Sequence, residues 1–354
     1  MDFGIALATS TESWKVVQRA ETLGFSHAWF YDTQLLNPDV FIGMTMAAMH
    51  TSRIRLGTGV LIPSNRIEPV TANALATLNK IAPGRIDFGV GTGFTGRRTM
   101  GLRAIPLDRM KAYIERVQKL LLGETVSWPH EGERHEIGFL NPDLGLINLD
   151  DPIALHVSAM GPRSRRLTAE LGAGWLNFAA NEDAAARTLE DMQQAWRGAG
   201  RPSTDLYSTL FLLGAVLQPG EPFDSPRAVA QAGPWVTVFF HNLVETTEPG
   251  SMESIIGKPL SDRLEQYRAV YNGYPAKRRH LHNHRGHLMF IRPEEQFLVT
   301  GQLIEQMTFT GDLEALRARV ARLAAAGYDQ LTVQLVEGHE QALEDWARVF
   351  RLAP

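Results

Sequence analysis

Strand-like and helix-like segments alternate along almost the whole chain, and this alternation restricts the possible folds more than any other feature. Short apolar runs predict strands at residues 3–8, 28–31, 54–62, 86–90, 153–157, 174–178, 206–217 and 328–335. Amphipathic patterns between them predict helices at 12–23, 40–49, 73–81, 107–121, 163–171, 185–199, 294–305, 312–326 and 343–350. Eight strand–helix units in one chain predict an α/β fold of the (β/α)₈ TIM-barrel type. A doubly wound open sheet is the competing interpretation.

Two segments interrupt the alternation. Residues 123–151, after the fourth strand, are rich in Gly, Pro, Asn and Asp and are expected to form a long loop with room for a hairpin. Residues 219–293, after the seventh strand, hold prolines, glycines, aromatic residues and histidines. We interpret the chain as a single domain, residues 1–354, with these two insertions. The second insertion leaves and rejoins the catalytic face of the barrel, so we predict a lid over a pocket there; a dimerisation arm is the alternative.

The composition excludes several classes of function. The 35 Lys and Arg residues against 39 Asp and Glu give a net charge of −4, so we expect no nucleic-acid partner. The absence of cysteine excludes disulfides, thiolate metal sites and cysteine nucleophiles. No signal peptide is visible at the start, and no apolar run is long enough to span a membrane. We therefore expect a cytoplasmic protein without a membrane partner.

The stretch GRIDFGVGTGFTGRRTMG at residues 84–101 joins a strand to a glycine-rich loop. From Gly91 to Gly96 it matches the G-x-G-x-x-G pattern of dinucleotide-binding folds. That pattern requires a helix that opens inside it and an acidic residue at a strand end about 20 residues later. Here the next helical pattern begins only near Pro106, and Asp108 lies at the start of that helix. We therefore prefer a glycine-rich loop that forms one wall of a flat cofactor site.

Five motifs, in order along the chain, resemble the bacterial luciferase-like family of reduced-flavin and reduced-deazaflavin oxidoreductases. They are TLGFSHAWFYD at the second strand, TSRIRLGTGVLIP at the third, GRIDFGVGTG at the fourth, PIALHVSAMGPRSRRLTAELGAGWL at the fifth and sixth, and TFTGDLEALRARVARLAAAGYDQLTVQL near the end. The resemblance implies an insertion-bearing barrel whose pocket, at the carboxyl ends of the strands, holds an isoalloxazine-type ring. It also implies a homodimer, because that pocket lies near a dimer interface in many members.

The resemblance implies that polar residues at the end of the second strand contact the ring or act in catalysis. Asp32 and Gln34 are therefore the candidate catalytic residues in this region. Thr33 stands where the deazaflavin-dependent sugar-phosphate dehydrogenases have a histidine, which argues against that particular activity. The alternative role for Asp32 is that of a helix or turn cap.

Cofactor-binding positions in the third and fourth strands follow from the same resemblance. Gly59 and Val60 correspond to a non-prolyl cis peptide behind the ring in deazaflavin-using relatives. The alternative is that glycines simply let a barrel strand bend here. Thr92 and Gly93 belong to the glycine-rich wall of the predicted cofactor site.

A predicted phosphate site follows the fifth strand. Gly161 precedes a proline that suits the first turn of a helix, and the free N–H groups of a helix start attract anions. Arg163 and Ser164 would add charge-assisted hydrogen bonds to a phosphate. The resemblance places Ala159 and Met160 beside the cofactor as well. An ordinary turn with a solvated basic face is the alternative.

The segment HLHNHRGH, residues 280–287, is the densest polar cluster of the chain. Three histidines at alternate positions would face one side of a strand, as metal ligands do, but no carboxylate lies close by in sequence. We expect no metal. We predict instead that the segment lies over the barrel mouth, where His284 and His287 contact substrate or carry a proton. A surface loop without chemistry is the alternative.

Two enzymatic interpretations follow from the resemblance. In the first, which we favour, reduced FMN from a separate flavin reductase reacts with O₂, and the protein oxygenates a small organic substrate while excluding water. In the second, reduced coenzyme F420 exchanges hydride with a substrate carbon, and O₂ takes no part. Phe94 stands where sugar-phosphate dehydrogenase relatives carry an acidic residue, which weakens that deazaflavin subgroup. A flavin-binding protein without turnover is a third interpretation, although eight strand–helix units count against it.

Overall fold

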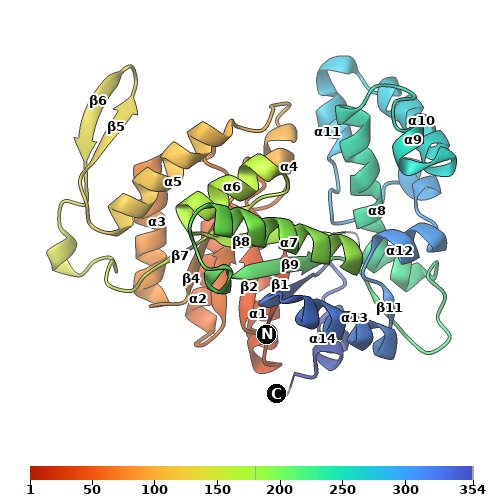
Figure 1. The fold of residues 1–354 in the computed structure, drawn as a ribbon, viewed down its shortest axis with the longest axis horizontal. Helices are drawn as coiled ribbons and strands as arrows, with labels where there is room; N and C mark the ends of the chain where they lie inside the picture. The colour runs from red at the N-terminus through yellow and green to blue at the C-terminus, as the bar shows by residue number, and fades with distance from the viewer. Residues whose placement is uncertain (180, 353–354) are drawn as a thin grey trace.

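Eight parallel strands close into a barrel in the computed structural model, which describes residues 1–179 and 181–352 (Figure 1). Strand β1 (Asp2–Leu7) is hydrogen-bonded to β2 (His27–Phe30) on one side and to β12 (Gln330–Gln334) on the other, which closes the sheet. The remaining barrel strands are β3 (Arg55–Thr58), β4 (Ile86–Val90), β7 (Ala154–Ser158), β8 (Gly174–Phe178) and β9 (Ser208–Leu212). The predicted TIM barrel is confirmed, and the open sheet is excluded.

Large side chains beside small ones fill the inside of the barrel. Trp29 on β2 and Phe211 on β9 are buried there, with ring centroids 6.1 Å apart. Gly57 on the neighbouring strand β3 makes room for Trp29, because a Cβ at this position would lie 2.5 Å from the indole ring. A filled barrel offers binding sites at its ends and not along its axis, which directs attention to the loops that follow the strands.

Helices surround the barrel and bury their apolar faces against it. In α5 (Leu107–Leu121) the predicted apolar stripe is buried at Met110, Ile114 and Val117. The other helices of this outer layer are α1 (Ser13–Thr22), α2 (Val40–His50), α3 (Glu68–Ile81), α6 (Pro162–Leu171), α7 (Glu182–Gly198), α13 (Leu313–Ala326) and α14 (Ala342–Phe350). The helices predicted for this layer are present, and their ends differ from the predicted ends by a few residues.

The insertion after the fourth strand is a hairpin. Strands β5 (Val126–His130) and β6 (Glu133–Ile137) pair antiparallel and project from the body of the protein beyond α5 (Figure 1). The indole N–H of Trp128 donates a hydrogen bond of 2.9 Å to Glu68, at the start of α3. This contact anchors the hairpin to the outer layer of helices.

The insertion after the seventh strand is mainly helical, whereas its prolines and glycines led us to expect irregular structure. It contains α8 (Pro226–Thr246), α9 (Glu253–Ile256), α10 (Lys258–Gly273) and α11 (Arg279–Asn283), which lie to the right of the barrel in Figure 1. Pro234 lies inside α8, and much of this helix is buried, so its sequence shows neither an uninterrupted helix nor a one-sided apolar stripe. A second apolar core beneath these helices includes Val236, Phe240 and Leu264.

Two predicted elements are interrupted in the structure. The strand expected at 206–217 divides into β9 and the short β10 (Val216–Leu217), which leaves the barrel and pairs with β11 (Gly311–Asp312). The helix expected at 294–305 starts as a 3₁₀ helix and continues, after a break, as α12 (Gly301–Met307). In both cases the apolar pattern runs through a change of chain direction, which local periodicity does not record.

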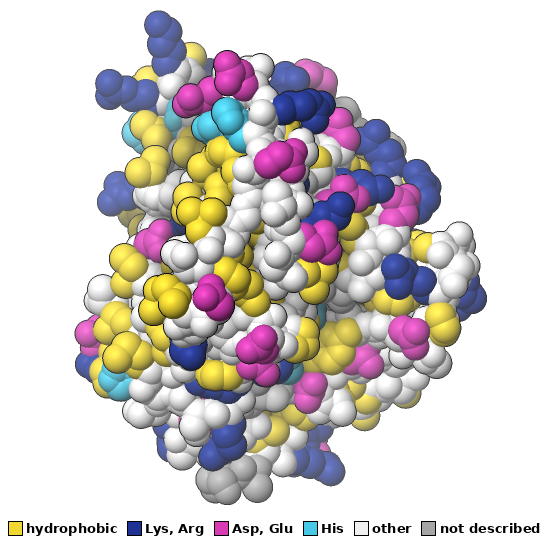
Figure 2. Space-filling view, turned by 90° about the vertical axis from the view of Figure 1, so that its left-hand side faces the viewer, with side chains coloured by type: hydrophobic (Ala, Val, Ile, Leu, Met, Phe, Trp, Pro, Cys, Tyr) yellow, Lys and Arg dark blue, Asp and Glu magenta, His cyan; other side chains and the backbone are white. Residues whose placement is uncertain are grey.

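Charged side chains of both signs are mixed over the surface. Figure 2 shows Lys and Arg interspersed with Asp and Glu, and hydrophobic side chains in several groups, on the face that it displays. This mixture agrees with the small net charge of −4. Within the described part of the chain, no helix combines the length and the apolar character that crossing a bilayer requires.

Candidate active site

The carboxyl ends of the barrel strands form a mouth that helix α8 of the insertion partly covers. Phe178, the last residue of β8, stacks on Phe211 of β9 with ring centroids 4.8 Å apart. Trp235 of α8 stacks on Phe178 at 6.3 Å, with the two rings 15° from parallel. The insertion therefore contributes an aromatic side chain to the wall of the mouth, as a lid would. Its movement on ligand binding stays a prediction.

A short helix opens inside the glycine-rich loop that follows β4. Helix α4 (Phe94–Arg98) begins directly after Gly93, whose φ of 78° lies in the left-handed region that favours glycine. The expectation that the next helix begins only near residue 106 is wrong. A helix of five residues is too short to show an apolar period in the sequence. The closed barrel nevertheless excludes the dinucleotide-binding fold that the glycine pattern matched.

Val60 lies next to this loop, beyond the end of β3. The peptide bond between Gly59 and Val60 is cis, as the resemblance implied. A Cβ on Gly91 would lie 2.6 Å from Val60 Cγ2, so glycine at this position lets the two strand ends approach closely. Val60 and Thr92 are both partly exposed. The structure thus brings together the predicted cofactor-binding residues of the third and fourth strands.

Asp32 is 4% exposed, and donors from the loop after β3 surround its carboxylate. Arg66 donates to both oxygens at 2.9 Å, while the Asn65 side chain and the Ile62 N–H donate at 3.2 and 3.3 Å. Gln34 accepts from Asn65 at 2.5 Å and donates to a backbone carbonyl of α4 at 2.8 Å. A carboxylate and an amide engaged in this way hold loops in place and have little capacity left for proton transfer. The geometry therefore favours a positioning role for both residues, and their catalytic role stays a prediction.

Helix α6 begins at the mouth with a capped first turn. The Gly161 N–H donates to Ser164 Oγ at 3.2 Å, and this hydroxyl donates to the Gly161 carbonyl at 2.9 Å. Arg163 is exposed, and so is Met160, to 56%, whereas Ala159 is buried. The residues predicted to bind phosphate therefore gather at an accessible helix start, but the Ser164 hydroxyl is already occupied. Phosphate binding stays a prediction, with Arg163 as the available charged group.

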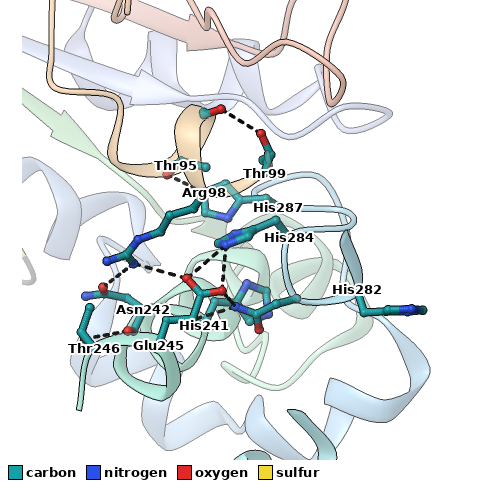
Figure 3. A network of polar contacts seen from close by, with 12 residues as sticks. Thr95, Arg98, Thr99, His241, Asn242, Glu245, Thr246, His282, His284 and His287 are labelled. Atoms are coloured by element: carbon teal, nitrogen blue, oxygen red, sulfur yellow. Dashed lines mark hydrogen bonds and ion pairs between the residues drawn. The ribbon is translucent and has the colours of Figure 1, made fainter. Parts of the chain in front are cut away.

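Three buried histidines lie beside α4, on the insertion side of the mouth (Figure 3). His284 and His287, both predicted to be catalytic, are joined there by His241 of α8, and the ring centroids are 5.8–6.4 Å apart. Thr95 of α4 approaches this group, with its Oγ1 3.4 Å from His287 Nε2. Each of the three rings has a buried Nδ1 without a hydrogen-bond partner among the described residues. The histidine segment thus lies against α4, next to the glycine-rich loop, and the catalytic role of His284 and His287 stays a prediction.

Glu245 lies one turn after His241 on α8 and connects the histidines to α4. Its carboxylate lies 3.0 Å from His284 Nε2, accepts from Asn283 Nδ2 at 2.7 Å and faces the Arg98 guanidinium at 3.6 Å. Burial would raise the pKa of Glu245, but the hydrogen bonds and charges of these neighbours lower it. Sequence reasoning counted His241 among the aromatic and titratable residues of the predicted lid without assigning it a role, and it missed Glu245. Their i, i+4 spacing would have been a signal if this segment had been recognised as a helix.

A second carboxylate, Glu295, holds His241 from the other side. His241 Nε2 and the Arg292 guanidinium both hydrogen-bond to Glu295 Oε1, and the Tyr267 hydroxyl lies 3.2 Å from the same oxygen. Burial would raise the pKa of Glu295, but His241 and Arg292 lower it to about 2. Burial lowers the pKa of His241, and Arg292 already balances the charge of Glu295, so this imidazole is neutral at pH 7.

His287 is likewise neutral at pH 7. Burial lowers its pKa well below 6.5, and the neighbouring His284 and His241 lower it further. A neutral imidazole has one protonated nitrogen and one that accepts a proton, which suits a group that exchanges protons with a substrate. The polar cluster therefore has the electrostatic character that proton transfer requires.

The strand considered for the histidine segment is absent, because residues Arg279–Asn283 form α11. His282 consequently points away from the other histidines (Figure 3). It stacks on Tyr274, with ring centroids 4.8 Å apart. Alternate residues of a helix lie on different faces, so they cannot converge on one ion. Within residues 1–179 and 181–352, no group of three His, Cys, Asp or Glu side chains is arranged to hold a metal.

A profile of the luciferase-like monooxygenase family matches residues 8–330, which is most of the chain. The chain belongs to this family. Membership agrees with the closed barrel, with the glycine-rich loop after β4 and with the cis peptide next to it.

The chain is similar to reductases and dehydrogenases. The 5,10-methylenetetrahydromethanopterin reductase of Archaeoglobus fulgidus is 31% identical to this chain over 215 residues. The match covers 59% of this chain and 62% of the reductase, so it spans less than two thirds of the length of the reductase. The F420-dependent hydroxymycolic acid dehydrogenase of Mycobacterium tuberculosis is 29% identical over 290 residues, or 70% of this chain and 77% of the relative. The solved coenzyme F420 dependent tetrahydromethanopterin reductase of Methanopyrus kandleri has a TM-score of 0.73 at 21% identity, and covers 98% of this chain and 97% of that one. This last similarity shows a shared fold.

Proposed function

We propose that the protein is a coenzyme F420-dependent oxidoreductase that exchanges hydride with a small organic substrate. The observation that carries this proposal is the similarity to an F420-dependent dehydrogenase over 77% of that relative's length. F420 thereby replaces reduced FMN as the favoured cofactor. O₂ and a separate flavin reductase are not required as partners.

The residues at the mouth fit a cofactor made of a flat ring and an anionic tail. Val60, Thr92 and Gly93 would hold the ring, where glycine lets the backbone come close. Arg163 and the free N–H groups of the first turn of α6 would hold a phosphate, and nothing lies within 4 Å of a Cβ built on Gly161, so the approach is open. When bound, the deazaflavin supplies or accepts hydride at its ring.

The chain itself positions the partners and limits the access of water. Phe178 and Trp235 place an apolar cover over the strand ends, which removes water from a reacting centre below it. Asp32 and Arg66 hold the loops that follow β2 and β3. Hydride transfer needs this kind of fixed geometry more than it needs reactive side chains.

A reduced-FMN-dependent monooxygenase is the second candidate. The observation that favours it is the same aromatic cover by Trp235, because reduced flavin chemistry with O₂ requires exclusion of water. In that case O₂ and a separate flavin reductase would be partners. A flavin-binding protein without turnover is less well supported, because the barrel is complete.

Anaerobic fluorescence titration of the purified protein distinguishes these candidates. We expect binding of F420 at micromolar concentration, and weaker binding of reduced FMN and of NADPH. Binding of reduced FMN without any response to F420 would favour the monooxygenase. Tight binding of NADPH alone would contradict both candidates and the cofactor site proposed for the glycine-rich loop.

A further inference from the structure

Thr95 links the barrel mouth to the histidines of the insertion. It lies in α4, directly beyond Thr92 and Gly93 of the proposed cofactor wall, and its side chain is partly buried. Its hydroxyl oxygen is 3.4 Å from Nε2 of His287. Figure 3 shows both side chains between α4 and the insertion. Hydrogen bonds that serve catalysis are often long before a substrate is bound. A hydroxyl next to a neutral imidazole nitrogen is an arrangement through which a proton can pass.

The Glu245–His284 pair stands behind His287. A carboxylate is only an acceptor, so the 3.0 Å contact places a proton on His284 Nε2. The two rings, His284 and His287, are 5.8 Å apart between centroids, and both Nδ1 atoms are buried without partners among the described residues. The backbone N–H of His287 donates to the His284 carbonyl at 3.2 Å, so Glu245, by holding His284, also holds the turn that carries His287.

The charges around His287 favour its neutral form. The other titratable groups that face it are His284 at the end of α11 and His241 of α8, and both disfavour an added charge on the ring. Two carboxylates lie near these histidines, and an arginine balances the charge of each. Glu245 contacts His284 and the guanidinium of Arg98. Glu295 contacts His241 and the guanidinium of Arg292. His287 is therefore neutral before the reaction, with one ring nitrogen available to accept a proton that it does not retain afterwards.

The end of β2 has no comparably placed base. Asp32 is surrounded by donors, and Thr33 follows it. A proton that leaves a substrate at this mouth therefore has a route through Thr95 of α4 to the buried neutral imidazole of His287 in the insertion. This places proton exchange and the proposed cofactor wall on the same loop.

We propose that Thr95 and His287 exchange a proton with the substrate, that Glu245 and His284 position His287, and that the substrate is an alcohol or the corresponding carbonyl compound. This inference rests on the proposed F420 dependence. In alcohol oxidation the C–H bond breaks and its hydride passes to oxidised deazaflavin, which gains the two electrons that the alcohol loses. The alcohol O–H proton moves to Thr95 Oγ1 as Thr95 gives its own proton to His287 Nε2, and the carbon–oxygen double bond forms. Reduction of the carbonyl compound follows the reverse path.

Anaerobic turnover with F420 and a panel of 2-propanol, 2-butanol and cyclohexanol tests the proposal. Thr95→Val keeps the shape but removes the hydroxyl, and His287→Gln removes the imidazole. We expect each to lower kcat by about 10²–10⁴-fold, the usual contribution of general acid–base catalysis, while binding of F420 is unchanged. Thr95→Ser retains the hydroxyl and should restore most of the activity. His282→Gln, on the exposed histidine that points away, is the matched control and should turn over like the unchanged protein.

A second measurement does not depend on turnover. Nitrogen NMR of imidazole-labelled protein without cofactor reports the tautomer of each histidine. We expect a proton on Nε2 of His284, and a neutral His287 with its proton on Nδ1 at pH 7. Glu245→Gln should change the nitrogen signals of His284 and His287, and Thr95→Val those of His287. The signal of His282 should stay the same in both variants.

The outcomes separate the two proposals. No binding of F420 contradicts the proposed function and the redox step that rests on it, while the NMR result still decides whether Thr95, His287 and the Glu245–His284 pair form the inferred arrangement. Binding of F420 without oxidation of any alcohol in the panel overturns the substrate class. Unchanged turnover by Thr95→Val or His287→Gln overturns the proton path.

Discussion

Single residues decide how the barrel mouth is held, and Arg66 is the clearest case. It pairs with Asp32, a carboxylate that is 4% exposed. Arg66→Leu leaves this buried charge without its cation, and breaking such a pair costs about 3–5 kcal/mol. We expect chemical denaturation to show a loss of that size. The surface pair of Glu12 and Lys15, with side chains 64% and 59% exposed, is the control, and Glu12→Gln should change stability by less than about 0.5 kcal/mol. Equal losses of stability in Arg66→Leu and Glu12→Gln would contradict the conclusion that Arg66 balances a buried charge.

Arg163 is the residue on which the proposed phosphate site depends. Its side chain is exposed at the start of α6, so Arg163→Ala removes a charge without disturbing packing. A hydrogen bond to a charged group contributes about 1.5–3 kcal/mol, so binding of F420 should weaken roughly ten- to a hundredfold. Affinity for the deazaflavin ring without its phosphate tail should not change, as fluorescence titration can measure. Equal weakening for both ligands would show that the substitution had disturbed the mouth and not a phosphate site.

At the scale of structural elements, the helical insertion is predicted to close over the mouth. Lys277 and Arg278 are exposed between α10 and α11 and offer sites for trypsin. We expect cleavage there to slow when F420 is bound, because closure makes this segment less accessible. Arg134, exposed in the distant hairpin, is the matched control whose cleavage rate should not respond. If the rate of cleavage at 277–278 is the same with and without F420, dimerisation is left as the role of the insertion.

At the scale of the whole molecule, buried neutral histidines make stability depend on pH. Burial is the main cause that lowers the pKa of His27, to about 4, and those of His241 and His287. Below pH 6.5 the unfolded chain binds protons that the folded chain does not, so stability is highest above about 6.5 and falls toward pH 4. Between its lowered pKa and pH 6.5, each such histidine changes the free energy of unfolding by about 1.4 kcal/mol per pH unit. Urea denaturation across this range should show that the free energy of unfolding falls as the pH falls. His27→Gln should make this dependence on pH less steep, and His282→Gln, at an exposed position, should leave it unchanged.

The predicted homodimer also belongs to the whole molecule. Exposed apolar side chains gather on α2 and at the start of α3, including Ile42, Met49 and Val70, which are 59%, 70% and 50% exposed. We propose that this surface contacts a second copy of the chain, which would remove it from water. Ile42→Glu with Met49→Glu should convert a dimer to a monomer in sedimentation, with thermal stability retained. Leu140→Glu, at a residue 90% exposed near the hairpin, is the control. A monomeric unchanged protein would contradict the proposal.

The sequence by itself determined the barrel, the positions of its two insertions and the region of the mouth. Eight strand patterns and the helices between them were visible because each element buries one face or its whole length, and burial leaves a period in the sequence. The motifs around Gly59, Gly93 and Gly161 pointed to three segments that the structure brings to the carboxyl ends of the strands. Helix α8 escaped this reasoning because Pro234 interrupts it and much of it is buried, so no single face stands out.

Only the tertiary structure decided which polar side chains act together. The sequence suggested Asp32 as a catalytic group, whereas the structure pairs its carboxylate with Arg66. Thr95 had no sequence signal, but its side chain contacts His287, which is 192 residues away in the chain. Glu245 and His284 likewise meet although they are 39 residues apart, with α9, α10 and α11 between them in the chain. Local patterns record how much of each residue is buried, whereas a hydrogen bond depends on where two distant backbones place their side chains in space. The chemistry of this mouth therefore follows from the packing of the insertion against α4, which no local stretch of the sequence contains.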